Sequence, residues 1–326
     1  MPSQPAPQGA ESCRSEGEKA FLKSPSMRRV LSVRDYIRTW PLKPEAKLMY
    51  ECFAEFWGTM MIAVFGVGSV NTAIAVGAHS DLWHVAMIWG FGVSLAIYCT
   101  ASVSGAHLNP AVSLAFAMFR GSQFPWSKLG WYWLAQMAGG VAGGAMNFLI
   151  FFPYIGRQER LERLEDPGFS RGGGGSEISA MVFGEYYPAP DWVRGNELEG
   201  EDASKLVSTL GALCVEAWGT GILMFVIMAL TDDKQKVLIH KEMVPFMIGF
   251  TVAVLIGCYA PLTQAGWNPA RDFGPRLVAA MAGWGKIAIP GPRNGFWVYI
   301  LGPMLGAPLG AFAYVMTIEP GLRMAQ

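Results

Sequence analysis

The segment "GWNPARDF", Gly266–Phe273, closes a run, Met243–Ala270, that contains no Asp, Glu, Lys or Arg. Its central tripeptide, Asn-Pro-Ala, also occurs at 109–111 in "GAHLNPAVSL", within the uncharged run Leu82–Phe119. Asparagine is a preferred helix N-cap, and proline is favoured at the first helical position. Each copy therefore predicts that a helix begins inside an apolar segment.

The composition indicates a membrane protein. The 326 residues are 52% hydrophobic and 15% charged, whereas soluble domains carry about 25% charged residues. Several uncharged runs reach the ~20 residues that a helix needs to cross a bilayer, so we expect an all-α membrane fold. The predicted spans are 48–70, 83–103, 128–152, 205–230, 243–262 and 295–317. A net charge of zero gives no indication of a nucleic-acid partner.

The two segments that follow the Asn-Pro-Ala copies are too short to cross a bilayer. Pro110–Phe119 has ten residues, which as a helix is about half of a ~30 Å hydrocarbon core. We therefore predict two re-entrant half-helices, one after each copy.

The chain also contains an internal repeat. "AEFWGT" at 54–59 recurs as "VEAWGT" at 215–220. The number of residues between Asn109 and Asn268 is nearly the same as the number between these two segments. Each repeat holds three spans and one half-helix. Because three is odd, the repeats must be inverted, and this arrangement places the functional site near the midplane between them.

Charge outside the spans predicts the topology. Residues 1–47 form a polar, basic tail that we expect to be disordered and cytoplasmic, and the lysine-rich linker 231–242 is also assigned to the cytoplasm. The acidic connection 153–204 then faces outward between repeats 48–152 and 205–318. The short C-terminus, 319–326, returns to the cytoplasm.

Four of the five cysteines lie in apolar segments without metal-ligand spacing. They are expected to be buried apolar residues, and no metal or cofactor is predicted.

The asparagine side chains suggest a direct role at the midplane. If the side-chain oxygen of Asn109 or Asn268 caps its own helix, the amide NH₂ is fixed as a donor. Two such caps, tip to tip, would present two donors beside two positive helix ends. This arrangement favours the oxygen of a neutral solute and repels protons and cations.

The segments "SGAHLNPAVS" and "NPARDFGP" closely resemble the two pore signatures of the major intrinsic protein family, the aquaporins, and of its glycerol-conducting branch. The resemblance covers residues 48–318 as a channel domain. It implies a homotetramer that is embedded in the lipid of the plasma membrane. The channel would pass glycerol and water, and the further solutes to be expected are urea and small polyols.

The resemblance also implies roles for particular residues. Main-chain carbonyls before each asparagine would line the pore, and they belong to Gly105, Ala106 and His107 in the first repeat and to Gln264, Ala265 and Gly266 in the second. Glu55 and Glu216 would brace the re-entrant loops, with proton coupling as the alternative. Asp272 would bond loop backbone beside its helix start.

The selectivity filter implied by the resemblance consists of Trp89, Ile256, Ala265 and Arg271. Gly257 replaces Ile256 if the alignment shifts by one residue, and neither supplies the histidine of the water-selective branch. The position of Ala265 is commonly aromatic in the bacterial glycerol facilitator, and the neighbouring Trp267 is a candidate to compensate.

Three other functions are compatible with parts of the sequence. A water-selective aquaporin is disfavoured by Asp272 and by the absent histidine, while a coupled secondary transporter would also use inverted repeats. A membrane enzyme is disfavoured because the four histidines lie in unrelated segments and form no recognisable catalytic arrangement.

Overall fold

The computed structural model describes residues 46–198, 202, 205–237 and 240–324. The chain divides into two units, Met1–Ala46 and Lys47–Gln326, and only the second is described in detail. The predicted disorder of the N-terminal tail falls outside the described residues, as does Cys13.

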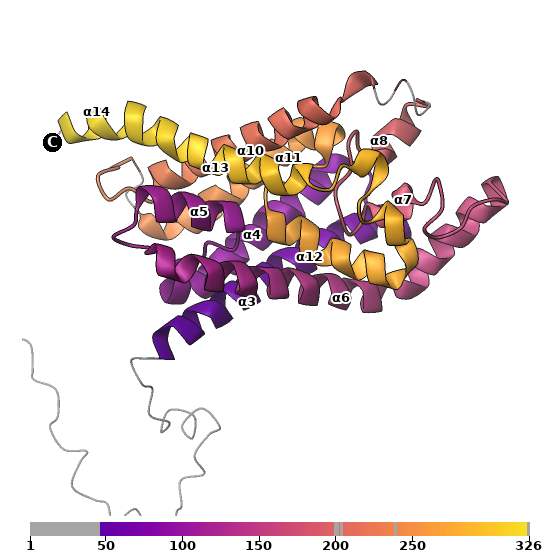
Figure 1. Cartoon of the computed structure of the whole chain (residues 1–326), viewed down its shortest axis with the longest axis horizontal. Helices are drawn as coiled ribbons and strands as arrows, with labels where there is room; N and C mark the ends of the chain where they lie inside the picture. The colour runs from indigo at the N-terminus through magenta and orange to yellow at the C-terminus, as the bar shows by residue number, and fades with distance from the viewer. Residues whose placement is uncertain (1–45, 199–201, 203–204, 238–239, 325–326) are drawn as a thin grey trace, which may run out of the picture. The chain divides into compact units, whose positions relative to one another are not determined.

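Within the described residues, six helices are long and apolar enough to cross a membrane. They are α3 (Lys47–Asn71), α4 (Leu82–Ser104), α6 (Trp126–Glu165), α10 (Thr209–Leu230), α11 (Val244–Thr263) and α13 (Val298–Thr317). Two shorter helices, α5 (Pro110–Phe119) and α12 (Pro269–Ala279), begin at the two Asn-Pro-Ala copies. Figure 1 shows these two helices approaching each other from opposite ends of the bundle.

Shorter elements connect the long helices. They are η2 (Thr72–Val76), α7 (Glu177–Ala180), α8 (Pro190–Gly195), η3 (Lys241–Met243), η4 (Ala280–Trp284), η5 (Gly285–Ile287), η6 (Pro292–Asn294) and α14 (Glu319–Met324).

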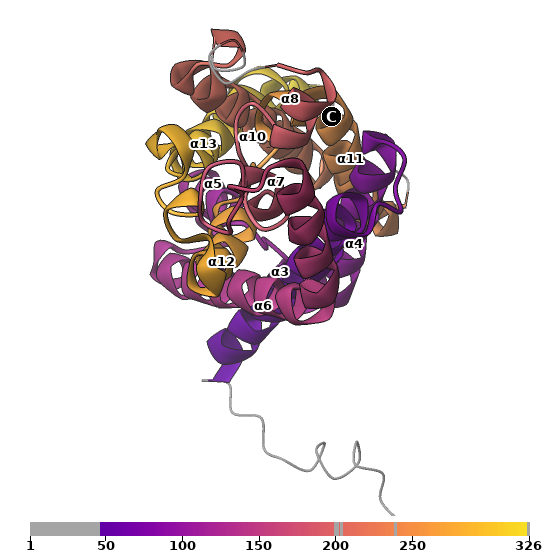
Figure 2. The same cartoon turned by 90° about the vertical axis from the view of Figure 1, so that its right-hand side faces the viewer.

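The packing of the helices follows the sequence repeat. Helix α3 packs on α6 in the first repeat, as α10 packs on α13 in the second. Each half-helix crosses to the other repeat, so that α12 packs on α6 and α5 packs on α13. In the end-on view of Figure 2 the two half-helices lie on one side of the bundle, between α13 and α6.

Helices α4 and α11 meet between the repeats at two glycines in matched positions. A Cβ atom on Gly249 would lie 2.1 Å from the main-chain oxygen of Gly90. Real Cβ atoms do not approach so closely, so the contact depends on the missing side chains. Helix–helix association in lipid commonly uses such small residues.

The third helix is longer than predicted. It continues through Pro153 to Glu165 instead of ending at 152, and its 40 residues span about 60 Å. The charged extension is held by ion pairs from the connection that follows it, Arg171 to Glu159 at 2.7 Å and Arg194 to Glu162 at 2.6 Å. The sequence did not predict this extension, because Pro153 and the charged residues after it both argue against a spanning helix.

The cysteines were also predicted wrongly. Cys99, Cys214 and Cys258 are exposed, and Cys52 is half-buried. Large apolar side chains share this outer surface, including Trp57, Leu149 and Leu210. An apolar outer surface is expected for helices that face lipid, where periodicity no longer separates an interior face from an exterior one.

Candidate pore and constriction

The two asparagines cap their own helices and bind the opposite loop. The side-chain oxygen of Asn109 accepts from the Ala111 N–H at 2.9 Å, and that of Asn268 accepts from the Ala270 N–H at 3.0 Å. The amide of Asn109 donates to the Trp267 carbonyl at 2.9 Å.

The equivalent bond from the amide of Asn268 reaches the Leu108 carbonyl at 2.8 Å. The sequence predicted both NH₂ groups as pore donors, but one hydrogen of each amide binds the opposing loop. An amide carries two N–H groups, so one remains on each asparagine. Both residues line a cavity of about 290 Å³.

The loops before the asparagines share an unusual backbone. Ala106 and Leu108 have φ of 51° and 53°, and the matched residues Ala265 and Trp267 have φ of 61° and 49°. Non-glycine residues rarely adopt this left-handed region, and they keep it only where the surroundings impose it. The same strained geometry therefore recurs in both repeats.

The predicted carbonyl-bearing residues lie along two cavities. Five of the six line the 290 Å³ cavity, namely Gly105, Ala106, His107, Ala265 and Gly266. Gln264 lines only a second cavity, of about 300 Å³, beyond the constriction. Its side chain has a different role, described below.

A glutamate from each first helix holds each loop. Glu55 accepts from the main-chain N–H of His107 at 3.0 Å and of Leu108 at 2.7 Å, and from the Ser104 hydroxyl at 2.6 Å. The amide of Gln136 donates to the same carboxylate at 2.7 Å.

Glu216 makes the corresponding contacts in the second repeat. It accepts from the N–H of Gly266 at 3.0 Å, the N–H of Trp267 at 2.7 Å and the hydroxyl of Thr263 at 2.6 Å. Both glutamates are fully buried. All of these partners are donors, as an ionised carboxylate requires.

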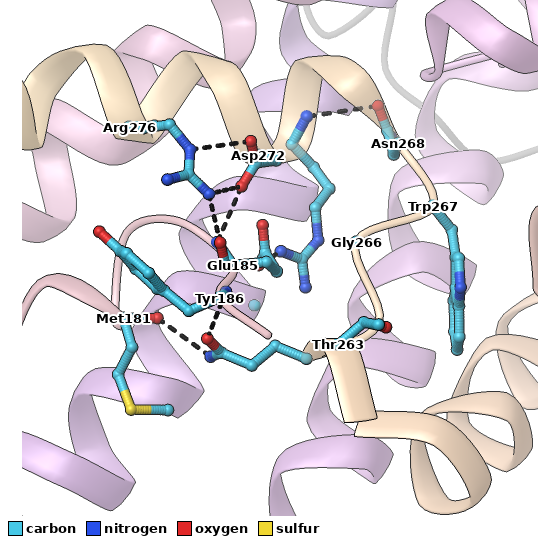
Figure 3. A network of polar contacts seen from close by, with 12 residues as sticks. Met181, Glu185, Tyr186, Thr263, Gly266, Trp267, Asn268, Asp272 and Arg276 are labelled. Atoms are coloured by element: carbon cyan, nitrogen blue, oxygen red, sulfur yellow. Dashed lines mark hydrogen bonds and ion pairs between the residues drawn. The ribbon is translucent and has the colours of Figure 1, made fainter. Parts of the chain in front are cut away.

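The Trp267 side chain does not replace the ring that is absent at Ala265. A Cβ atom on Gly219 of α10 would lie 2.2 Å from the indole nitrogen of Trp267, so the indole fills the space above that glycine. Leu108 occupies the matched space above Gly58 in the first repeat. In Figure 3 the indole lies on the opposite side of the Gly266 segment from Glu185.

The four predicted filter residues come together. Trp89, Ile256, Ala265 and Arg271 are all buried and all line the 290 Å³ cavity. Trp89, Ile256 and Arg271 also line the second cavity, of about 300 Å³, so they stand where the two cavities meet. The Arg271 guanidinium lies 4.0 Å from the centre of the Trp89 ring. Gly257 is exposed on the outer surface, which selects Ile256 between the two alignments.

The sequence did not predict the partner of Arg271. Glu185, from the connection between α7 and α8, forms an ion pair with Arg271, and both side chains are 6% exposed. The acidic connection was predicted to lie outside the membrane, so an acid within it gave no signal. The available sign was its isolation in an apolar segment, "AMVFGEYYPAP", 180–190.

Asp272 bonds loop backbone, and it also pairs with an arginine that was not predicted. Its carboxylate accepts from the Glu185 N–H at 2.8 Å and from the Arg276 guanidinium at 2.6 and 3.0 Å. The oxygen of the Gln264 side chain accepts from the Tyr186 N–H at 2.8 Å. Figure 3 shows this network joining α12 to the loop. Burial raises the pKa of Tyr186, so its hydroxyl stays neutral.

Charged groups lie near both mouths of the cavities. The 290 Å³ cavity extends to Thr231 and Lys241, where Lys241 binds Asp233 at 2.6 Å and lowers the pKa of that carboxyl. At the opposite mouth, a hydrogen bond from the His84 main chain lowers the pKa of Asp81. In the described part of the chain, no group of three or more His, Cys, Asp or Glu residues has the geometry of a metal site.

Six spanning helices, two opposed half-helices and a lined cavity between them define a membrane protein with the aquaporin fold. A model of the family described as "Major intrinsic protein" matches residues 43–314. The chain belongs to this family and is an integral multi-pass membrane protein.

Two bacterial facilitator proteins are similar to this chain over most of its length. The chain is 41% identical to the glycerol uptake facilitator protein of Pseudomonas aeruginosa over 86% of its own length and 93% of that protein. It is 39% identical to the propanediol uptake facilitator PduF of Citrobacter freundii over 84% of its own length and 94% of that protein.

The solved structure of the aquaglyceroporin from Plasmodium falciparum matches with a TM-score of 0.70 at 23% identity. This match covers 85% of the chain and 99% of the Plasmodium chain. The family and the branch predicted from the two signatures are confirmed.

Proposed function

We propose that the protein is a passive channel for glycerol and other small uncharged polyols, which also passes water. The observation that supports this proposal is that the constriction is amphipathic. Trp89 and Ile256 form an apolar edge, and Arg271 supplies donors beside the indole. A polyol has a hydrocarbon edge and a hydroxyl edge that suit these two sides. The names of the two bacterial relatives support the same solute class.

Exclusion of ions and protons is assigned to the midplane. Helices α5 and α12 begin there, each with the positive end of its dipole directed at the cavity. The remaining N–H of Asn109 and of Asn268 would donate to each passing oxygen. A cation meets two positive helix ends and finds no carboxylate of Glu55 or Glu216 available, because hydrogen bonds occupy both groups.

A water-selective pore is the alternative. The family resemblance implies a histidine in the fifth span of the water-selective branch, and this position holds the apolar Ile256. Stopped-flow light scattering on proteoliposomes separates the two functions. A glycerol gradient should cause shrinkage followed by rapid re-swelling. Shrinkage with no faster re-swelling than in protein-free vesicles would contradict glycerol conduction.

We further propose that the protein catalyses no reaction and couples transport to no gradient. Glu55 and Glu216 are the acids that a coupled transporter would use, and both accept hydrogen bonds from loop main chain. Solute uptake should therefore rise linearly with the gradient and should not respond to collapse of a proton gradient.

The assembly and the orientation are also proposals. A homotetramer in the plasma membrane, with both termini in the cytoplasm, follows from the family resemblance and from the basic linker near Lys241. Size-exclusion chromatography with light scattering tests the tetramer, and protease protection in sealed vesicles tests the orientation. A monomeric mass in mild detergent, or a protected linker in inside-out vesicles, would contradict these proposals.

A further inference from the structure

The loop segment Gly184–Tyr187 is fixed against the constriction. Arg276 donates to the Glu185 carbonyl at 2.5 Å, and Asp272 accepts from the Glu185 N–H at 2.8 Å. A Cβ atom on Gly184 would lie 2.8 Å from the Arg276 guanidinium carbon, so glycine allows the close approach. The backbone of Glu185 is thus bonded on both sides, and its side chain has one defined place.

The side chain of Glu185 is buried beside Arg271, and one of its carboxylate oxygens is available as an acceptor. Its Oε1 atom pairs with Arg271. Its Oε2 atom is buried and has no hydrogen-bond partner among the described residues. Glu185 and Arg271 both line the second cavity, of about 300 Å³. An unsatisfied buried carboxylate oxygen is costly unless a ligand or water binds it.

The ion pair also changes the charge at the constriction. The guanidinium of Arg271 brings one positive charge, and the adjacent carboxylate balances it. A passing solute therefore meets donors and an acceptor side by side. Ala265 contributes only a methyl group to the lining of the 290 Å³ cavity, so this side of the constriction has little apolar surface.

We propose that Glu185 is a fifth selectivity residue, which accepts a hydrogen bond from one hydroxyl of a polyol while Arg271 donates to the neighbouring hydroxyl. The inference rests on the proposed function and names its solute class: molecules with hydroxyls on adjacent carbon atoms. Water depends less on this acceptor, because water molecules in file bind one another. A polyol fills the constriction and depends on the wall for its hydrogen bonds.

The test compares Glu185→Ala and Glu185→Gln with the unsubstituted protein in proteoliposomes. Glycerol and water permeabilities are measured on the same vesicles. Loss of one hydrogen bond to a charged group corresponds to a fall of roughly tenfold in glycerol permeability relative to water for Glu185→Ala. Glu185→Gln keeps an acceptor oxygen without its charge, so it should show a smaller fall.

Glu177→Ala is the matched control. Glu177 is an acid on the same connection. Like Glu185 it lines a cavity of about 750 Å³, but it is absent from the two cavities that meet at Arg271. It should leave both permeabilities unchanged, and an equal effect of Glu177→Ala would overturn the assignment.

Other outcomes also decide the matter. An unchanged ratio of glycerol to water permeability in Glu185→Ala overturns the proposal, whether both permeabilities are kept or both fall by the same factor. An equal fall would mean that Glu185 only stabilises the loop. If Glu185→Ala conducts no water, the ratio is read from Glu185→Gln, where an unchanged value overturns it. Failure of the proposed function looks different: the unsubstituted protein would conduct water and no glycerol.

Discussion

Replacing Glu216 by glutamine should weaken the fold without altering any coupling to protons. The carboxylate accepts three hydrogen bonds, and two of these come from the main-chain N–H groups of Gly266 and Trp267, one on each oxygen. Glutamine converts one oxygen into an NH₂ donor. Whichever way the amide turns, one buried main-chain N–H then faces a donor and loses its acceptor.

The expected cost follows from that single lost acceptor. A buried donor left without a partner costs about 1–3 kcal/mol. For a large domain this corresponds to a fall in Tm of about 2–12 °C, at roughly 2–4 °C per kcal/mol. Thermal unfolding of the purified protein in detergent, followed by tryptophan fluorescence, measures the change.

Glu55→Gln is the matched comparison from the other repeat. The N–H groups of His107 and Leu108 bind one oxygen each, so one main-chain bond is lost here too, but the total cost should be no larger because the new NH₂ group has an acceptor nearby. Gln136 donates to Glu55, and the Oε1 atom of Gln136 has no hydrogen-bond partner among the described residues. The Gln136 amide can therefore turn and accept from the new NH₂ group. The Ser113 hydroxyl, which now accepts from Gln136 at 2.9 Å, can rotate to donate instead.

Two results would refute this reasoning. One is a Glu216→Gln variant as stable as the unsubstituted protein, or more stable. The other is solute uptake that responds to a proton gradient in the unsubstituted protein and loses this response in either variant, because a bracing residue has no such effect.

Three further experiments test other parts of the structure. Asp272→Ala leaves the buried Arg276 guanidinium without its carboxylate, at a cost of about 3–5 kcal/mol in the free energy of unfolding. Adding Arg276→Met should recover part of the lost Tm, and a double variant no more stable than the single one contradicts this. Gly249→Leu should abolish a monodisperse peak in size-exclusion chromatography, because a Cβ atom there meets the facing helix at 2.1 Å, whereas Gly257→Ala, in ordinary contact at 3.6 Å, should not. Arg271→Ala should admit a five-carbon polyol that the unsubstituted channel excludes in the re-swelling assay, and an unchanged size limit contradicts its place at the constriction.

The parts of the fold that lie within the bilayer were predictable from the sequence. Buried main-chain groups must be satisfied without water there, so apolar runs of fixed length predict helices. The repeat then predicted that Glu55 and Glu216, and likewise Asn109 and Asn268, occupy matched places. The structure brings each pair to such places, although their roles in permeation remain proposals.

The parts that were not predictable depend on contacts between distant segments. The bond from the Glu185 N–H to Asp272 joins residues 87 positions apart, and the apolar neighbours of Glu185 in the sequence do not indicate which distant residue it contacts. The extension of α6 to Glu165 depends in the same way on arginines from the following segment. Arg276 had a local sign, because it lies four residues after Asp272 on one helix face.

The two halves of the structure differ where the repeat is broken. Val112 and Ser113 occupy the positions in α5 that Arg271 and Asp272 occupy in α12. Val112 lines the same 290 Å³ cavity without a charge, and Ser113 accepts from Gln136 within its own repeat. Asp272 instead holds the loop that brings Glu185 to Arg271. The symmetric residues, the glutamates and the asparagines, fix the two loops alike, so substitutions there should affect stability in either repeat. Discrimination between solutes requires groups that only one end possesses, and these are concentrated where Arg271, Asp272 and Glu185 meet.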